Sequence, residues 1–163
     1  MMKQKGLFVC LIGGLLSALG CTAKKMPEGD LLRVEYSRHG TMAGPEYEGI
    51  VKQDSTGAYV LVAMRESYGP YYTKQLTVDE VQQFRLIIEE EKMYKYKESY
   101  RPRMEVLDGW GWSFSAKFSD GTKIYSHGSN ASPHGNGLAR ICGWMKELAQ
   151  EGEQIEKPED EDE

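Results

Sequence analysis

The sequence predicts an α+β fold: a single two-layer domain in which an antiparallel sheet of about five strands carries two helices on one face. Three observations predict it. Short segments alternate apolar and polar residues, two longer segments repeat apolar residues at helical intervals, and Gly, Asp and Pro punctuate the chain between them. The expected order is three strands, a helix, two strands and a helix, because helices on one face bury both apolar stripes most simply.

The first half supplies three expected strands. The segment LLRVEYS, residues 31–37, alternates apolar and polar residues, which is typical of a strand with one wet face. After a loop rich in Gly and Pro, segments 47–53 and 58–66 flank the turn residues DSTG and should form a hairpin. The stretch from Ala58 to Met64 is apolar on both faces, so we expect it in the middle of the sheet.

The first helix should begin at Thr77 and run toward residue 97. Thr77 and Glu80 have the spacing of a capping box, and Asp79 lies in the first turn, where the helix dipole favours an acid. Apolar residues at helical intervals predict its buried stripe: Val81, Phe84, Ile87 and Ile88. We interpret Glu89, Glu90 and Glu91 as a solvated face rather than a metal site. An irregular connector should follow this helix.

The segment 110–118 alternates without interruption and should pair with 122–128. A two-residue turn would place Ile124 among polar side chains. A three-residue loop over 119–121, with Gly121 in the left-handed conformation, instead pairs Ala116 with Ile124 and Phe114 with Ser126. Because a slip of one residue turns every side chain to the other face, we choose this register. It points His127 away from the core.

The last helix should span about 137–150, with Asn136 as a possible cap. Its apolar stripe comprises Leu138, Ile141, Cys142, Met145, Leu148 and Ala149. Cys142 lies within this stripe, so we interpret it as a small buried hydrophobic residue and not a nucleophile.

Both ends of the chain have the composition of segments outside the folded domain. Residues 1–20 have two lysines followed by an apolar run that is too short to span a bilayer, as in a secretory signal peptide. The sequence LSALGC, ending at Cys21, resembles the lipobox of bacterial lipoproteins, which implies acylation of Cys21 and a membrane tether over 21–30. An unlipidated secreted protein is the alternative. The acidic tail, 151–163, should be disordered.

The charge and cysteine content exclude two classes of protein. The whole chain has a net charge of −5, but residues 21–150 contain 17 basic and 17 acidic residues. A nucleic-acid-binding domain should have a basic surplus, so we exclude that class. Cys10 lies in the expected signal peptide and Cys21 would be lipidated, as the resemblance implies, which leaves Cys142 without a partner and excludes a disulfide framework. Residues 31–150 are enough for one core.

One block of the sequence resembles a group of uncharacterised bacterial proteins. The spacing of Met42, Gly44 and Tyr47, followed by LDGWGWSFSAKFSDGTKIYSHGSNASP, is similar to that group's typical pattern LDG..W.......DG..I...G.NAYP. Ser132 stands where the group typically has Tyr, and Gly111 separates the two tryptophans. The resemblance covers most of residues 31–148. It implies the outline of the domain, a strand pair before the last helix, and no particular chemistry.

Catalysis and metal binding have little support in the sequence. His127 and Ser129 lie near the end of one expected strand, and Asp108 precedes its neighbour, so a small hydrolase using these three residues is the catalytic alternative. No Gly-x-Ser-x-Gly motif is present. The three histidines lack the spacing of a zinc site, so we predict no metal and no cofactor.

We expect a binding or accessory role instead. The stretch SHGSNASPHGN, residues 126–136, is either a ligand-binding loop or only the turn and cap between a strand and a helix. Aromatic residues in the expected loops would suit a protein, peptide or glycan partner. The predicted contact residues are His127, Ser129, Asn130, His134, Trp110, Tyr71 and Tyr72, with Tyr68, Tyr94, Tyr96, Tyr100, Arg101 and Arg103 nearby. The sequence therefore predicts a membrane-tethered, non-catalytic binding lipoprotein of the bacterial cell envelope, with a purely structural envelope protein as a further alternative.

Overall fold

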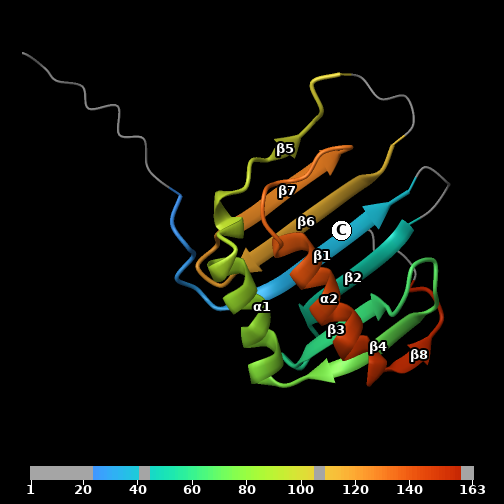
Figure 1. Ribbon diagram of the computed structural model, residues 1–163. Helices are drawn as coiled ribbons and strands as arrows, with labels where there is room; N and C mark the ends of the chain where they lie inside the picture. Colours follow the sequence, from blue (N-terminus) through green and yellow to red (C-terminus); the bar gives the residue numbers. More distant parts are fainter. Residues whose placement is uncertain (1–23, 41–44, 105–108, 159–163) are drawn as a thin grey trace, which may run out of the picture.

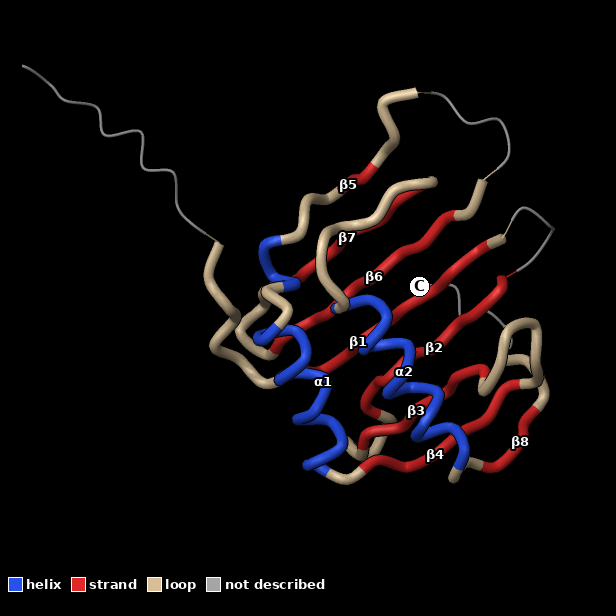
Figure 2. The backbone as a smooth tube through the Cα atoms, in the orientation of Figure 1, coloured by secondary structure: helices blue, strands red, loops and turns tan. Residues whose placement is uncertain are grey.

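The computed structural model describes residues 24–40, 45–104 and 109–158. Within them the chain forms one eight-stranded sheet, and helices α1 and α2 lie side by side over the same face of it (Figure 1). Figure 2 shows the two layers without side chains, with the opposite face of the sheet uncovered by helices. The predicted α+β class is confirmed, whereas the expected five strands and their order are wrong.

The elements follow one another in this order: β1 (Leu31–His39), β2 (Pro45–Gln53), β3 (Tyr59–Met64), β4 (Tyr71–Leu76), α1 (Val78–Glu90), the 3-10 turn η1 (Met93–Lys95), β5 (Ser99–Tyr100), β6 (Gly111–Phe118), β7 (Lys123–Ser129), α2 (Gly137–Gln150) and β8 (Glu153–Ile155). Across the sheet the strand order is β5-β7-β6-β1-β2-β3-β4-β8. Each neighbouring pair is antiparallel except β5 and β7, which are parallel. The core lies between this sheet and the two helices.

Three strands were not expected from the sequence. The strand β4 was interpreted as a loop because Gly69 and Pro70 precede it and its residues do not alternate clearly; Tyr71 and Leu76 are buried, yet they point to opposite faces. The strands β5 and β8 have only two and three residues, which is too short for a periodic signal. Because β8 pairs with β4, residues 153–155 of the acidic tail are ordered, and the predicted disorder is wrong for them.

The hairpin of β6 and β7 has the register predicted from its alternation. Ala116 lies opposite Ile124, Phe114 opposite Ser126 and Ser113 opposite His127. Gly121 has φ +84°, the left-handed conformation that a three-residue loop requires. His127 is accordingly on the face away from the helices.

The helices agree with the sequence in their starts and in most of their buried stripes; Leu138 and Cys142 of α2 were expected to be buried but are only half-buried. Thr77 and Glu80 form the predicted capping box, and Val81, Phe84, Ile87 and Ile88 are buried. The helix α1 ends at Glu90, earlier than predicted, because Lys92 adopts a left-handed conformation with φ 52°. The predicted side-chain cap by Asn136 is absent from α2; the backbone N–H of Asn136 instead donates to a carboxylate oxygen of Glu91.

The predicted tether is largely part of the domain. The backbone N–H groups of Glu28 and Gly29 donate to Asp120, that of Asp30 donates to Ser119 Oγ, and Arg85 donates to the carbonyls of Pro27 and Gly29. Lys24 Nζ donates to the carbonyl of Tyr96. The expectation of a tether over 21–30 is therefore wrong for residues 24–30, because these polar contacts hold the segment against the turn between β6 and β7, α1 and the carbonyl of Tyr96. Residues 1–23, with the predicted signal peptide and Cys21, lie outside the described residues.

Asp120 should control the docking of this segment through its charge. Hydrogen bonds, first from Thr122 and then from the backbone N–H groups of Gly29 and Glu28, lower the pKa of Asp120 to about 2 from its ordinary 3.8. Since the pKa is lower in the folded state, the stabilisation is complete above pH 3.8 and is lost as the pH falls through about 2. A carboxyl chemical-shift titration should give a midpoint near 2; a midpoint near 3.8 would contradict the hydrogen bonds that Asp120 accepts from Thr122, Gly29 and Glu28.

Candidate functional site

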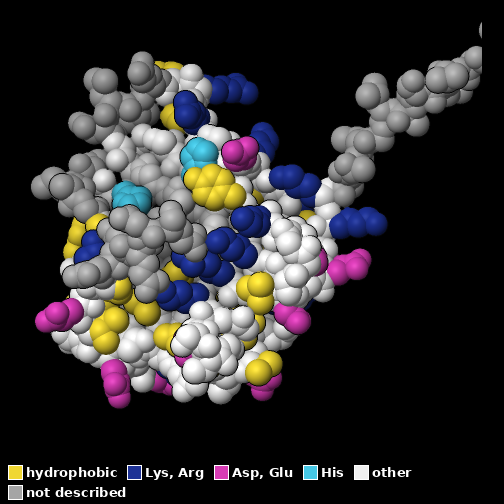
Figure 3. Space-filling view, turned by 180° about the vertical axis from the view of Figure 1, so that it is seen from behind, with side chains coloured by type: hydrophobic (Ala, Val, Ile, Leu, Met, Phe, Trp, Pro, Cys, Tyr) yellow, Lys and Arg dark blue, Asp and Glu magenta, His cyan; other side chains and the backbone are white. Residues whose placement is uncertain are grey.

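The face of the sheet opposite the helices, here called the open face, has a row of basic side chains. Lys123 lies directly opposite Lys117, Lys117 opposite Arg33, and Arg33 opposite Lys52. These four residues, here called the cation row, come from the adjacent strands β7, β6, β1 and β2. At a strand spacing of about 4.8 Å they span roughly 14 Å. Figure 3 views this face and shows Lys and Arg side chains gathered in a band across it.

Like charges placed directly opposite one another destabilise a sheet, and one carboxylate offsets part of that repulsion. Burial by itself would raise the pKa of Glu35, but the hydrogen bond from Ser115 Oγ at 2.7 Å and the ion pair with Arg33 outweigh it. Lys117 adds to the effect, so the pKa of Glu35 is held below its usual value. Glu35 thus stays ionised beside Arg33 at neutral pH.

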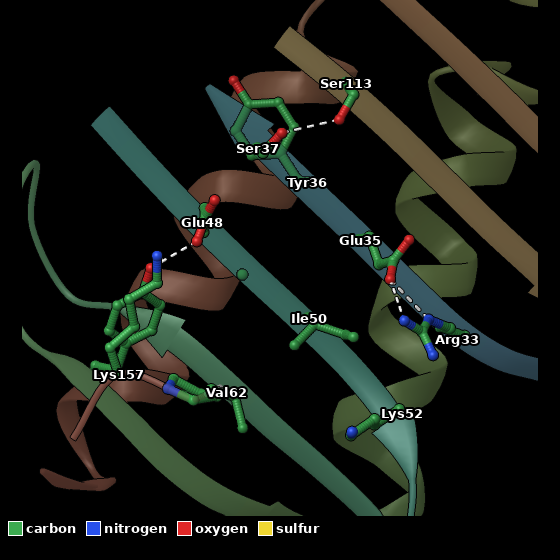
Figure 4. A pocket seen from close by; sticks show the side chains of 13 residues that line it. Arg33, Glu35, Tyr36, Ser37, Glu48, Ile50, Lys52, Val62, Ser113 and Lys157 are labelled. Carbon is green, nitrogen blue, oxygen red and sulfur yellow. Dashed lines mark hydrogen bonds and ion pairs between the residues drawn. The ribbon is translucent and has the colours of Figure 1, made fainter. Parts of the chain in front are cut away.

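A cavity of about 430 Å³ lies beside the cation row and includes two of its members, Arg33 and Lys52. Ile50 and Val62, which lie opposite each other on β2 and β3, supply apolar surface within it. Figure 4 shows Glu48 and Lys157 on one side of these apolar side chains and Arg33, Glu35 and Lys52 on the other. The hydroxyl of Tyr71 donates to Glu48 at 2.5 Å. The cavity therefore combines an apolar centre with walls that carry both basic and acidic side chains.

A second row on the open face consists of hydroxyl groups and imidazole. Ser37 Oγ lies 2.8 Å from Ser113 Oγ and 3.3 Å from His39 Nε2. His127 lies opposite Ser113, next to the ring of Tyr125 at 5.5 Å between centroids. Its Nδ1 is buried and has no hydrogen-bond partner among the described residues. These groups can donate and accept hydrogen bonds beside the charged row.

The loop that follows β7 acts as a structural turn. Asn130 has φ 49°, its backbone N–H donates to the carbonyl of Trp110, and its side-chain oxygen accepts from the N–H of Trp110. The indole of Trp112 donates to the carbonyl of Ala131 at 2.7 Å. His134 is exposed, on the segment between this turn and α2. Residues 126–136 thus hold β6 and β7 together, and only the side chains of His127 and Ser129 belong to the open face.

Most of the aromatic residues that we predicted as a contact surface are packed instead. Tyr71 and Tyr96 are buried, the ring of Tyr100 contacts those of Tyr96 and Trp112, and Tyr72 lies under the guanidinium of Arg65 at 3.7 Å. Trp110 is half-buried beside Arg38. Among the described tyrosines, only Tyr68 and Tyr125 are exposed. The sheet extends further than the sequence indicated, so it covers side chains that were assigned to loops.

The catalytic alternative gains no geometric support from the described residues. His127 and Ser129 lie two positions apart on β7, and in the described chain no hydrogen bond joins them; Asp108 lies outside the described residues. Cys142 is half-buried against the core, and burial raises the pKa of its thiol.

In residues 24–40, 45–104 and 109–158 no group of three or more His, Cys, Asp or Glu side chains is arranged to hold a metal ion. No helix in these ranges is long and apolar enough to cross a membrane.

The chain matches no known family model, no curated protein and no solved structure. Its own geometry defines a two-layer α+β domain with one sheet face left open by the helices. The similarity of residues 107–133 to uncharacterised bacterial proteins therefore remains a prediction.

Sequence reasoning missed the cation row entirely. Each of its members lies on the polar side of an amphipathic strand, where a lysine or arginine is unremarkable on its own. The available signal was the predicted register of the β6–β7 hairpin, which already placed Lys117 and Lys123 on one face. The alignment with Arg33 and Lys52 depends on which strands are neighbours, and residue patterns within a strand do not specify that.

Proposed function

We propose that this protein is a membrane-tethered, non-catalytic binding domain of the bacterial cell envelope, and that its open face binds an acidic polypeptide segment of a partner. The observation that carries the proposal is the cation row: four basic side chains in register on a sheet face that neither α1 nor α2 covers. An acidic ligand would place carboxylates beside these basic side chains and form ion pairs with them.

The surroundings of the row favour a polypeptide as the ligand. Ile50 and Val62 offer apolar surface between the charged walls of the cavity, and the hydroxyls of Ser37 and Ser113 lie beside it. A peptide carries carboxylates, backbone polar groups and apolar side chains together, so it can use all three kinds of surface. Electrostatic attraction across such a face would also speed association and make binding depend on ionic strength.

The lipid anchor proposed at Cys21 would place the open face near the membrane surface. Only Thr22 and Ala23 separate Cys21 from residue 24, where the segment docked on the domain begins. The three steps from Cys21 to residue 24 span at most about 11 Å, so an acylated Cys21 would hold the domain close to the membrane surface. Acylation with two or more chains would give a stable anchor, and a Cys21→Ser variant should leave the membrane fraction.

Binding is tested by calorimetry with a synthetic peptide of alternating Asp and Glu residues as the probe. Replacing both Lys52 and Lys117 with Gln should weaken binding about tenfold, equivalent to about 1.4 kcal/mol, because each exposed ion pair contributes up to about 1 kcal/mol. Raising the ionic strength should also weaken binding of the probe to the native protein.

The matched control replaces Lys92 and Lys146 with Gln, which makes the same change in net charge outside the sheet, at the end of α1 and on α2. It should leave probe affinity unchanged. Equal weakening by both pairs would show attraction to net charge alone and refute the site. Absence of probe binding would favour a purely structural protein. Tighter binding of an anionic polysaccharide than of the peptide would indicate a polysaccharide partner instead of a polypeptide.

A further inference from the structure

The strand β8 directs the rest of the chain onto the open face. It pairs with β4 at the edge of the sheet, and the two residues after Glu156, namely Lys157 and Pro158, line the same cavity as Arg33 and Lys52. Figure 4 shows Lys157 at this cavity, beside Glu48. The chain therefore reaches Pro158 already on the side of the sheet that bears the cation row, and not on the side of the helices.

The sequence that follows Pro158 is EDEDE, residues 159–163, with an acidic side chain at every position. Five extended residues span at most about 17 Å. From Lys52 to Lys117 the cation row covers two strand spacings, roughly 10 Å. Since Pro158 shares a cavity with Arg33 and Lys52, the segment is long enough to lie along most of the row.

Charge makes the row the complementary surface for this segment. The acids on the cavity wall are already engaged: Glu35 with Arg33 and Ser115, and Glu48 with Tyr71. Residues 159–163 contain no apolar side chain that would direct them to another surface. A ligand joined to its site by a short linker also has a high effective concentration, in the millimolar range.

We propose that residues 159–163 bind the cation row of their own chain and compete with the acidic partner, so that the protein regulates its own binding face. This inference rests on the proposed function, because the row is the same site. The acidic segment acts as an internal substitute for the ligand. A partner must displace it, and binding should therefore be weaker than the row alone permits.

The test uses the full chain with all five acids neutralised: E159Q, D160N, E161Q, D162N and E163Q. If the segment occupies the row about nine-tenths of the time, this variant should bind the Asp/Glu probe peptide about tenfold more tightly than the native chain. The matched control should bind the probe less tightly than the tail variant. It neutralises five exposed acids elsewhere: Glu66, Asp79, Glu89, Glu98 and Glu147. Equal affinity of the native chain and the tail variant would overturn the inference and leave the proposed function intact.

Amide chemical shifts give a second readout that does not require a partner. Neutralising the tail should shift the backbone amide resonances of Lys52, Arg33 and Lys117, and should have little effect once Lys52 and Lys117 are already Gln. Shifts of this kind without any probe binding would support the internal contact and refute the proposed function. Unchanged resonances at the row would refute the internal contact directly.

Discussion

Replacing Phe114 with Ala should lower the free energy of unfolding by about 3–5 kcal/mol, the usual range for a fully buried phenylalanine. Phe114 is completely buried on β6, opposite Tyr36 of β1 and Ser126 of β7, where the sheet meets the helices. The loss combines the apolar surface removed from the core with a cavity that the surrounding strands cannot close. Urea denaturation should show a lower midpoint with an unchanged slope.

A matched substitution on the same hairpin tests the register as well as the burial. Tyr125 of β7 lies on the open face and is 53% exposed. Tyr125→Ala should change the free energy of unfolding by less than about 1 kcal/mol, since exposed side chains away from special contacts have small effects. If the two substitutions had similar effects, the hairpin would not be paired as described, and His127 and the cation row would lose their place on the open face.

Replacing Gly128 with Ala should destabilise the domain by about 2–4 kcal/mol. A Cβ atom at this position would collide with the indole of Trp112 and the carbonyl oxygen of Ala131, which are hydrogen-bonded to each other at 2.7 Å. The expected loss adds an overpacking cost of about 1–3 kcal/mol to one hydrogen bond of about 1 kcal/mol. Thermal unfolding and tryptophan fluorescence should both report the change.

Gly111 is the control for this prediction. It lies across the same hairpin, and the nearest atom to an added Cβ is the carbonyl oxygen of Gly128 at 3.6 Å, an ordinary contact. Gly111→Ala should be neutral or slightly stabilising, because Gly in a strand costs about 0.5–1 kcal/mol relative to Ala. A mild effect of Gly128→Ala would mean that the turn after β7 can move, and the interpretation of residues 126–136 as a rigid turn would fail.

Local physical rules account for the parts of the fold that could be predicted. The alternation of β6 and the left-handed Gly121 leave only one register that keeps Phe114, Ala116 and Ile124 together. The capping box of Thr77 and Glu80 depends on residues three positions apart, so the start of α1 was predictable as well.

Most of the wrong predictions involve contacts between segments that are distant in sequence. Tyr71 and Tyr72 follow Gly69 and Pro70, which favoured a loop, but β3 and β8 recruit this segment into the sheet. The local sequence around Ile155 does not favour a strand strongly enough to offset the entropy lost on ordering. Backbone hydrogen bonds to β4 supply the missing stabilisation. Likewise, residues 24–30 are held by Asp120 and Arg85, side chains from later in the chain.

The candidate site was likewise predictable in its local features but not in its contacts between distant segments. By itself, the sequence determined which side of its strand each residue occupies, because side-chain direction alternates with a period of two. It thus placed His127, Lys117 and Lys123 away from the core. Only the tertiary structure decided that β1 lies between β6 and β2, and this neighbour relation aligns Arg33 and Lys52 with the two hairpin lysines. The row exists because four strands meet in register, and strand order depends on the packing of the whole sheet against its helices.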